Sequence, residues 1–278
     1  METIAKTLIR STLRQRINVL WGLSKHVNFS SSNQSSLNLS GIYPPIATPF
    51  NEDETIAYDK LQENMDRWNK IPLKGFVVQG SNGEYAFLDV DERIEMVKRV
   101  SEMAARDKLI IAGSGCESTR DTINMSKKMA SVGAKAVLVV TPCYYKGRMT
   151  NEALERHYTK TKNEDFQIIA GSAGFLYPAL AVGAVGGICA FANILGAECC
   201  RLHDLFKAGK HEEAKVLQHR MIMPNAGVTR VFGVSGLKAA MSWFGYYGGP
   251  VRSPLQLLNS EESLKLRQTF VASKLLDN

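Results

Sequence analysis

Beyond Gly41, short apolar runs alternate with segments whose apolar residues recur every three or four positions. Runs of the first kind predict buried strands, and segments of the second kind predict helices packed against them. The apolar runs predict six strands, at residues 42–48, 76–79, 109–112, 137–140, 166–170 and 187–191. After Ala192 the pattern is helical throughout, and we expect helices at 199–206, 212–223, 236–246 and 261–276.

The helices between the strands have identifiable starts and faces. Asp89 starts the second helix with acidic residues in its first turn, where they suit the helix dipole. Ser118 or Thr119 is expected to cap the next helix, and Thr150 the one after the fourth strand. Residues at helical spacing are expected in the core: Leu61, Met65 and Trp68 in the first helix, and Ile94, Val97, Val100 and Met103/Ala104 in the second.

Strands that alternate with helices predict a parallel sheet. Three of the strands end alike, in VVQGSNG, IIAGSGC and IIAGSAG, which indicates one βα unit repeated around a common mouth. None of these corners matches a phosphate-binding glycine motif. A closed barrel of this type needs eight strands, so we predict an α/β fold, an incomplete (β/α)8 TIM-type barrel of about six βα units with a C-terminal helical extension. Either the sheet is open or two units are absent.

The first forty residues differ from the rest in charge. They hold five basic residues against a single acid, and thus +4 of the net charge of +7, followed by a Ser- and Asn-rich stretch. This composition is typical of a mitochondrial transit peptide, although a merely disordered N-terminus would also fit it. We predict a transit peptide over residues 1–40, a barrel over 41–278 and a location in the mitochondrial matrix.

The remaining composition excludes several classes of partner. The chain after residue 40 is weakly basic and has no Lys/Arg cluster interleaved with aromatic residues, so no nucleic-acid partner is predicted. No run approaches eighteen apolar residues, so no membrane span is predicted. The five cysteines form no C-x-x-C pair, so neither a disulfide framework nor a zinc site is expected.

Five stretches occur in a characteristic order: GIYPPIATPF, GFVVQGSNGE, VVTPCYY, IIAGSAGF and GAVGGICAFAN. They resemble the dihydrodipicolinate synthase/N-acetylneuraminate lyase family of class I aldolase-type β/α barrels, and the resemblance covers nearly everything after Gly41. GSNGE, KGRM and the tail VTRVFGVSGLKAAMSWFGYYGGPVRSPL are most similar to the mitochondrial 4-hydroxy-2-oxoglutarate aldolases of that family. The resemblance implies a homotetrameric Schiff-base lyase for a small 2-oxo acid. It would release pyruvate and glyoxylate in hydroxyproline catabolism, without a metal or cofactor.

The resemblance also implies roles for individual residues. Ser81 would be the hydroxyl of a proton relay and a substrate contact, and Asn82 would bind the substrate carboxylate. Tyr144, in the T-P-x-Y motif, would be the catalytic relay tyrosine supplied across a subunit interface. Gly171 would bind the substrate through its backbone. A simple strand-end turn at Ser81 and Asn82, and an interface packing role for Tyr144, remain open as alternatives.

Two family segments are absent from this sequence. One is the Y-x-V-P segment with a second relay tyrosine, and the other is the G-x-K segment with the Schiff-base lysine. The chain passes from near Lys160 directly to Phe166, as if the fifth and sixth βα units, roughly sixty residues at the barrel average, were missing.

No other lysine is expected to replace the nucleophile, which must be desolvated at the mouth. Lys74, Lys108 and Lys135 precede strands and therefore belong to the opposite end of the barrel. Lys146 lies in a loop, and Lys238 lies inside a predicted helix.

We therefore expect a shortened aldolase-type lyase that is inactive as it stands. Three alternatives remain open. The chain could be a non-catalytic subunit that assembles with full-length chains, or another pyruvate-dependent lyase of the same family. It could also be a product that does not fold stably, because excising two units leaves unpaired strand edges.

Overall fold

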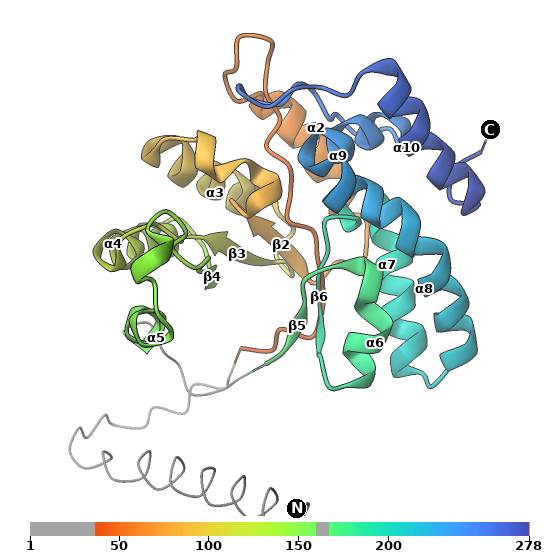
Figure 1. The fold of residues 1–278 in the computed structure, drawn as a ribbon, viewed down its shortest axis with the longest axis horizontal. Helices are drawn as coiled ribbons and strands as arrows, with labels where there is room; N and C mark the ends of the chain where they lie inside the picture. Colours follow the sequence, from red (N-terminus) through yellow and green to blue (C-terminus); the bar gives the residue numbers. More distant parts are fainter. Residues whose placement is uncertain (1–36, 160–166, 278) are drawn as a thin grey trace, which may run out of the picture. The chain divides into compact units, whose positions relative to one another are not determined.

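The computed structural model describes residues 37–159 and 167–277, and Figure 1 shows their arrangement. The chain divides into two units, residues 1–37 and 38–278, and every element below belongs to the second unit. The expected transit peptide, residues 1–40, lies almost wholly outside the described residues. In the part of the chain that is described, no helix has the length and apolar character needed to cross a bilayer.

Six short parallel strands form the centre of the second unit. They are β1 (Gly41–Tyr43), β2 (Gly75–Val78), β3 (Leu109–Gly113), β4 (Ala136–Leu138), β5 (Ile169–Ala170) and β6 (Gly186–Ile188). Two three-stranded sheets result, in the orders β1-β6-β5 and β2-β3-β4. A parallel bridge between Pro45 and Val77 joins the sheets just beyond β1, where the Val77 amide donates to the Pro44 carbonyl at 3.0 Å. The strand prediction is therefore confirmed, and the strands follow one another as β4-β3-β2-β1-β6-β5.

Nine α-helices are assigned in the described residues: α2 (Tyr58–Trp68), α3 (Val90–Met103), α4 (Thr119–Ser131), α5 (Asn151–Thr159), α6 (Leu176–Ala181), α7 (Ala192–Lys207), α8 (His211–Ala226), α9 (Gly233–Trp243) and α10 (Ser260–Ala272). Short 3₁₀ turns lie at η1 (Ser81–Gly83), η2 (Tyr85–Phe87), η3 (Lys146–Arg148) and η4 (Ala173–Phe175), and a π-helical segment, η5 (Gly227–Val231), follows α8. The helical tail after Ala192 is confirmed, with boundaries shifted by several residues.

The predicted helix starts are confirmed by their capping hydrogen bonds. Asp89 accepts from the Glu92 amide at 2.8 Å, and Glu92 accepts from the Asp89 amide at 3.0 Å, which is a complete capping box on α3. Ser118 caps α4 by accepting from the Asp121 amide at 3.0 Å. Thr150 accepts from the Ala153 amide at 3.3 Å at the start of α5.

The predicted core face of α3 is confirmed. Val97 and Val100 are buried, and Ile94 and Met103 are half-buried against the same core cluster. Arg93 and Met96 are buried as well, which the pattern did not predict. Arg93 turns inward because its guanidinium donates to the carbonyls of Gly113 and Gly115, at the end of β3. These long-range hydrogen bonds explain why a charged residue is buried on this helix.

Side chains on the strands alternate between two apolar clusters. Phe76 and Val78 belong to the large cluster that the strands share with the helices. Val77 instead packs with Tyr43 and Ile111 in a small cluster on the opposite face of the strands. This alternation matches a β/α barrel, in which one face of the sheet meets the helices and the other meets the barrel interior. Burial in this small cluster raises the pKa of Tyr43 to about 12.

The array ends at β4 on one side and at β5 on the other. Parallel strands normally have both faces covered by helices. Here, however, Val137 in β4 is 40% exposed, Val140 just beyond it is 37% exposed, and Ile168 just before β5 is 50% exposed. Among the described residues, no further strand pairs with the outer edge of β4 or of β5. The described strands thus form an open array and do not close into a barrel.

The C-terminal helix α10 is fastened by one aromatic side chain. Phe270 is fully buried and stacks on Phe191 with ring centroids 5.9 Å apart. Trp243 meets it edge-on, also at 5.9 Å, and Phe244 lies 5.6 Å away. Phe270 therefore ties α10 to α9 and to the segment that begins α7.

We predict that Phe270→Ala lowers the free energy of unfolding by about 3–5 kcal/mol, because it leaves a cavity among these rings. Chemical denaturation followed by circular dichroism measures the change. Leu264→Ala is the matched control, because Leu264 lies on the same helix and is 57% exposed. Equal losses in the two variants would contradict the assigned role of Phe270.

Candidate functional site

The corner after β2 carries the most distinctive polar residues of the chain. Ser81 and Asn82 open the 3₁₀ turn η1, where Ser81 is exposed and Asn82 is half-buried. The turn is closed by the Gly83 amide, which donates to the Gly80 carbonyl at 2.9 Å. The buried hydroxyl of Thr48, in the segment after β1, stabilises the turn by donating to the Gly83 carbonyl at 2.7 Å. The corner thus presents a hydroxyl and an amide, both neutral, at the C-terminal end of the strand.

A buried ion pair lies directly behind this corner. Glu84 has a left-handed backbone, with φ 55°, and its carboxylate lies 2.6 Å from the Lys238 ammonium of α9. Both side chains are almost completely buried, and Lys238 also donates to the Pro250 carbonyl at 2.7 Å. Burial lowers the pKa of Lys238 from its ordinary value, whereas the Glu84 carboxylate opposes that shift.

Arg252 completes the charge network around Glu84. Its backbone amide donates to Glu84 at 2.9 Å, and its guanidinium makes two contacts with the Glu92 carboxylate, at 2.7 and 2.8 Å. The ring of Phe50 lies 4.5 Å from both the Arg252 guanidinium and the Lys238 ammonium. The network joins the corner, α3 and the segment after α9, so it holds the polar corner in position.

Tyr144 lies beyond β4, in the segment that follows the strand. The side chain is 76% exposed and meets Tyr145 edge-on at 5.0 Å. Its backbone amide donates to Glu117 at 3.0 Å, which lowers the pKa of that carboxylate. Among the described residues, no hydrogen bond joins Tyr144 to Ser81. The structure therefore places the two residues at the same end of the strands but does not connect them.

Gly171 follows β5 and is exposed. Its neighbour Ser172 caps η4, where it accepts from the Gly174 amide at 3.2 Å and from the Asn225 side chain at 3.0 Å. All the predicted site residues thus follow the C-terminal ends of parallel strands. The three Gly-Ser corners nevertheless differ locally, because Ser114 is buried against Ser126 at 2.8 Å.

Four of the five lysines considered as nucleophiles are accounted for by other contacts or by their position, and the side chain of the fifth, Lys146, lies outside what the structure describes. Lys108 donates to the carbonyls of Ile71 and Leu73, which precede β2, so it lies at the end of the array away from Ser81. Lys74 directly precedes β2, and Lys135 directly precedes β4. Lys238 is buried in α9 and bound to Glu84. In the described part of the chain, none of these four ammonium groups has both the location and the freedom that imine formation requires.

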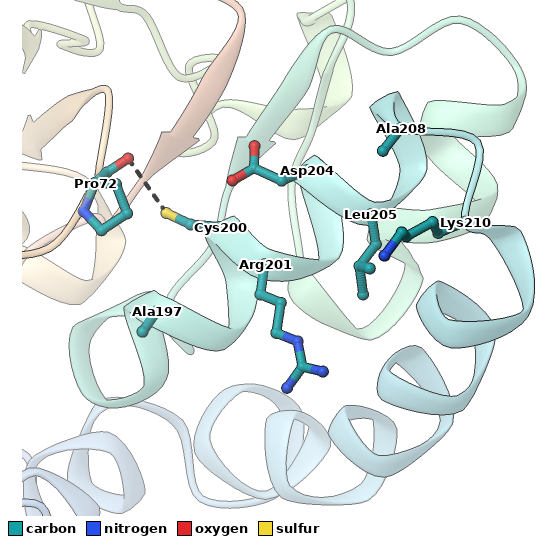
Figure 2. A pocket seen from close by; sticks show the side chains of 8 residues that line it. All are labelled: Pro72, Ala197, Cys200, Arg201, Asp204, Leu205, Ala208 and Lys210. Atoms are coloured by element: carbon teal, nitrogen blue, oxygen red, sulfur yellow. Dashed lines mark hydrogen bonds between the residues drawn. The ribbon is translucent and has the colours of Figure 1, made fainter.

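Two cavities lie near the strand ends. One, of about 380 Å³, lies beside the corner and is lined by Tyr85, Arg93, Cys116, Glu117 and Thr141 among others. The other, of about 360 Å³, lies along α7 (Figure 2). In it Cys200 donates to the carbonyl of Pro72, at the N-terminal end of β2 and hence opposite Ser81, and burial raises the pKa of Cys200 to about 12. A buried thiol with a raised pKa does not act as a nucleophile. Because this cavity also lies at the end of the strands opposite Ser81, it is not the predicted site.

The arrangement at the corner suits the binding of an anion. A hydroxyl and an amide can hydrogen-bond a carboxylate, and the ammonium nearest behind them, that of Lys238, is held by Glu84. Sequence reasoning missed the roles of Glu84, Arg252 and Asn225. Each acts through a partner far away in the sequence, and no local pattern marks such a pairing. In the described residues, no cluster of three or more metal-ligating side chains occurs.

Comparison with known proteins places the chain in a family. The Dihydrodipicolinate synthetase family model matches residues 38–161 and 157–273. A 4-hydroxy-2-oxoglutarate aldolase, described as probable and mitochondrial, from Emericella nidulans is 27% identical over 293 residues, covering 84% of this chain and 94% of its own. A DapA-like lyase described as uncharacterized, from Halobacterium salinarum, is 28% identical over 283 residues, covering 83% and 92%. A 4-hydroxy-tetrahydrodipicolinate synthase of Haloarcula marismortui is 26% identical, covering 85% and 94%.

Solved structures agree on the fold. A dihydrodipicolinate synthase from Bacillus anthracis superposes with a TM-score of 0.79 at 21% identity, covering 87% of this chain and all of the other. The 4-hydroxy-tetrahydrodipicolinate synthase of Methylacidiphilum fumariolicum gives 0.78 at 23% identity, covering 85% and 96%. The family model covers most of the sequence, and the strand order and corners agree with this fold. The chain belongs to the dihydrodipicolinate synthetase family.

Proposed function

We propose that this chain is a shortened 4-hydroxy-2-oxoglutarate aldolase-type member of the family, which retains a carboxylate-binding corner but does not catalyse carbon–carbon cleavage. Its ligand would be a small 2-oxo acid, held by Ser81, Asn82 and the backbone at Gly171. Its assembly would be the homotetramer implied by the family resemblance, and its location the mitochondrial matrix, on the composition of residues 1–40.

The aldolase subtype rests on motifs and on one relative. GSNGE, the KGRM after TPCYY and the long tail around GVSGLKAAMSWFGYYGG carry it in the sequence. The relative from Emericella nidulans, whose printed name is that of an aldolase, is 27% identical to this chain. Synthases of the same family are about as similar, so the assignment of the substrate depends on the motifs.

The position of Lys238 is the observation that carries the proposed loss of cleavage. Among the side chains that the structure describes, Lys238 is the lysine that combines burial with nearness to the corner, and its ammonium lies 2.6 Å from Glu84 and 2.7 Å from the Pro250 carbonyl. An amine must reach the substrate ketone before it can form an imine. Lys238 lacks that access, since its ammonium is bound to a carboxylate within the protein interior.

The lengths of the alignments support a missing segment. The alignment with the Emericella nidulans aldolase is 293 positions long, whereas only 84% of the 278 residues of this chain take part in it. The aldolase therefore has residues with no counterpart in this chain. The two stretches matched by the family model meet at residues 157–161, between β4 and β5. We infer that the fifth and sixth βα units, with the family's lysine and second tyrosine, are the part that is absent.

We predict that incubation with pyruvate and sodium borohydride leaves the mass of the chain unchanged, because no amine is available to form a reducible imine. Intact-mass spectrometry measures this, with the Emericella nidulans aldolase treated in parallel as the control. A stoichiometric pyruvyl adduct on any lysine would overturn the proposed inactivity, and peptide mapping would identify the nucleophile.

We predict that Lys238→Met lowers the free energy of unfolding by about 3–5 kcal/mol, because it leaves Glu84 buried without a partner. The double variant Lys238→Met/Glu84→Gln should recover part of this loss. The matched control is Lys265→Met, since Lys265 pairs with Glu261 at the same 2.6 Å but is 62% exposed, and we expect no measurable change there. A stable Lys238→Met variant would argue against a structural role for this lysine.

The exposed tyrosines favour a second candidate function, that of a non-catalytic subunit. Tyr144 and Tyr145 are 76% and 73% exposed, and adjacent exposed aromatic rings are typical of surfaces that become buried in assemblies. Glu117 holds the backbone of this segment in place. The chain could present Tyr144 to an intact copy of the enzyme, in line with the role implied for this residue.

We predict that co-expression with an intact aldolase of the same source yields mixed oligomers, which native mass spectrometry detects. Tyr144→Ser combined with Tyr145→Ser should reduce the mixed fraction, because it removes both rings from the interface. Phe175→Ser is the control, since this ring is also exposed but belongs to η4, after β5. Recovery of intact enzyme without this chain would count against the subunit role.

A further inference from the structure

We propose that Cys116 and Cys143 form a reactive thiol pair, which a low-molecular-weight disulfide converts to a disulfide bond. This modification site lies beyond the ends of β3 and β4. It is independent of the proposed carboxylate binding and of the proposed loss of cleavage, because it uses neither Ser81 nor Asn82.

The two thiols belong to neighbouring segments and line one cavity. Strands β3 and β4 pair in parallel, and their continuations stay in contact beyond the strands. A Cβ placed on Gly115 would lie 2.8 Å from the Val140 amide nitrogen. Cys116 directly follows Gly115 and is half-buried, and Cys143 is exposed. Both line the cavity of about 380 Å³ beside the corner.

The backbones of both cysteines are fixed, whereas their sulfur atoms make weaker contacts. The Cys116 amide donates to the Thr122 hydroxyl of α4 at 3.1 Å. The Glu117 carboxylate accepts from the Cys143 amide at 3.1 Å and from the Cys143 thiol at 3.5 Å. Because Glu117 directly follows Cys116, one carboxylate joins the two segments. A thiol is a weak donor, so Cys143 can leave Glu117 without loss of the backbone contact.

Arg93 gives Cys116 the surroundings of a reactive cysteine. Arg93 is only 7% exposed, lines the same cavity and donates from Nη1 to the Cys116 sulfur at 3.8 Å. Among the described residues, its Nε has no hydrogen-bond partner and no carboxylate forms an ion pair with it. A buried cation favours a negative charge beside it. The Cys116 thiolate supplies such a charge, and the thiolate is the nucleophilic form of cysteine.

The other three cysteines lack these surroundings. Cys189 and Cys199 are fully buried, and Cys200 is 4% exposed. A hydrogen bond with Cys189, together with burial, raises the pKa of the Cys199 thiol, and burial raises the pKa of Cys200 to about 12. We therefore expect the exchange to be confined to Cys116 and Cys143.

The exchange has two steps and needs no reactant beyond the small disulfide. The Cys116 thiolate attacks one sulfur of that disulfide, which forms a mixed disulfide and releases one small thiol, protonated by the proton that Cys116 lost. Cys143 then leaves Glu117, loses its proton and attacks the Cys116 sulfur, which releases the second small thiol. The chain loses two hydrogens, and the small disulfide is reduced to two thiols. The new bond ties the segment that carries Tyr144 to the segment after β3.

The experiment incubates the folded full chain with glutathione disulfide. The remaining thiols are then alkylated in denaturant, and intact-mass spectrometry with peptide mapping locates every modification. Cys116→Ser and Cys143→Ser remove one thiol each. Cys200→Ser is the matched control, because Cys200 also lines a cavity and donates its thiol to a carbonyl, but at the other end of the strands. Circular dichroism checks that each variant is folded, and Cys116→Ala and Cys143→Ala replace a serine variant that is not.

We expect the unaltered chain and Cys200→Ser to lose two hydrogens and to give one linked peptide pair that contains Cys116 and Cys143. Cys143→Ser should retain one glutathionyl group on Cys116, because the thiol that displaces it is gone. Cys116→Ser should form no internal disulfide and should react more slowly at Cys143. Arg93→Met should slow the reaction of Cys116, and Arg93→Lys should restore part of the rate, because lysine keeps the positive charge.

Three outcomes would overturn the proposal. The first is an unaltered, folded chain that keeps Cys116 and Cys143 as thiols after this treatment. The second is a mixed disulfide on Cys116 that persists although Cys143 is present, which would show that the two sulfurs do not meet. The third is modification of Cys189, Cys199 or Cys200 at the same rate, which would show that the cavity confers no selectivity.

Discussion

The buried ion pair between Glu84 and Lys238 links the corner after β2 to helix α9. Glu84 follows the polar corner of β2, and Lys238 lies in α9, far along the sequence. Two opposite charges in the protein interior are each costly to leave alone, so each requires the other. Arg252 links this pair to α3, because its backbone amide donates to the Glu84 carboxylate and its guanidinium binds Glu92. The corner can present Ser81 and Asn82 in a defined way because its base is fixed by these distant groups.

The same ion pair explains why a buried lysine does not imply an amine catalyst. Burial lowers the pKa of Lys238, which is one property of a nucleophilic lysine. The ammonium, however, is directed at Glu84 and at the Pro250 carbonyl, and its side chain is fully buried. Access to the substrate matters as much as the protonation state. A shift of pKa without access therefore describes a structural group.

Features that depend on neighbouring residues could be predicted from the sequence. The inner strands are covered on both faces, so they appear in the sequence as short apolar runs. The helix starts at Asp89, Ser118 and Thr150 depend on residues within one turn. The inward rotation of Arg93 could not be predicted in this way, because its partners are carbonyls at the end of β3. The contacts of Glu84 and Asn225 were missed for the same reason. The positions of Ser81, Asn82, Tyr144 and Gly171 at the strand ends followed from the motifs, but their hydrogen bonds did not.

The fold and the chemistry of this family depend on different parts of the chain. The large apolar cluster joins β1–β3 and β5 to α2–α4 and α6–α10, and these elements are present. The chemistry of a β/α barrel instead resides at strand ends distributed around the mouth, so it requires every strand that contributes a residue. On the proposed loss of two adjacent units, β4 and β5 would be the strands left exposed, and the packing between the other units would stay in place. Such a chain would keep the core of the fold and the corner at Ser81 and Asn82 while lacking the amine on which imine formation depends.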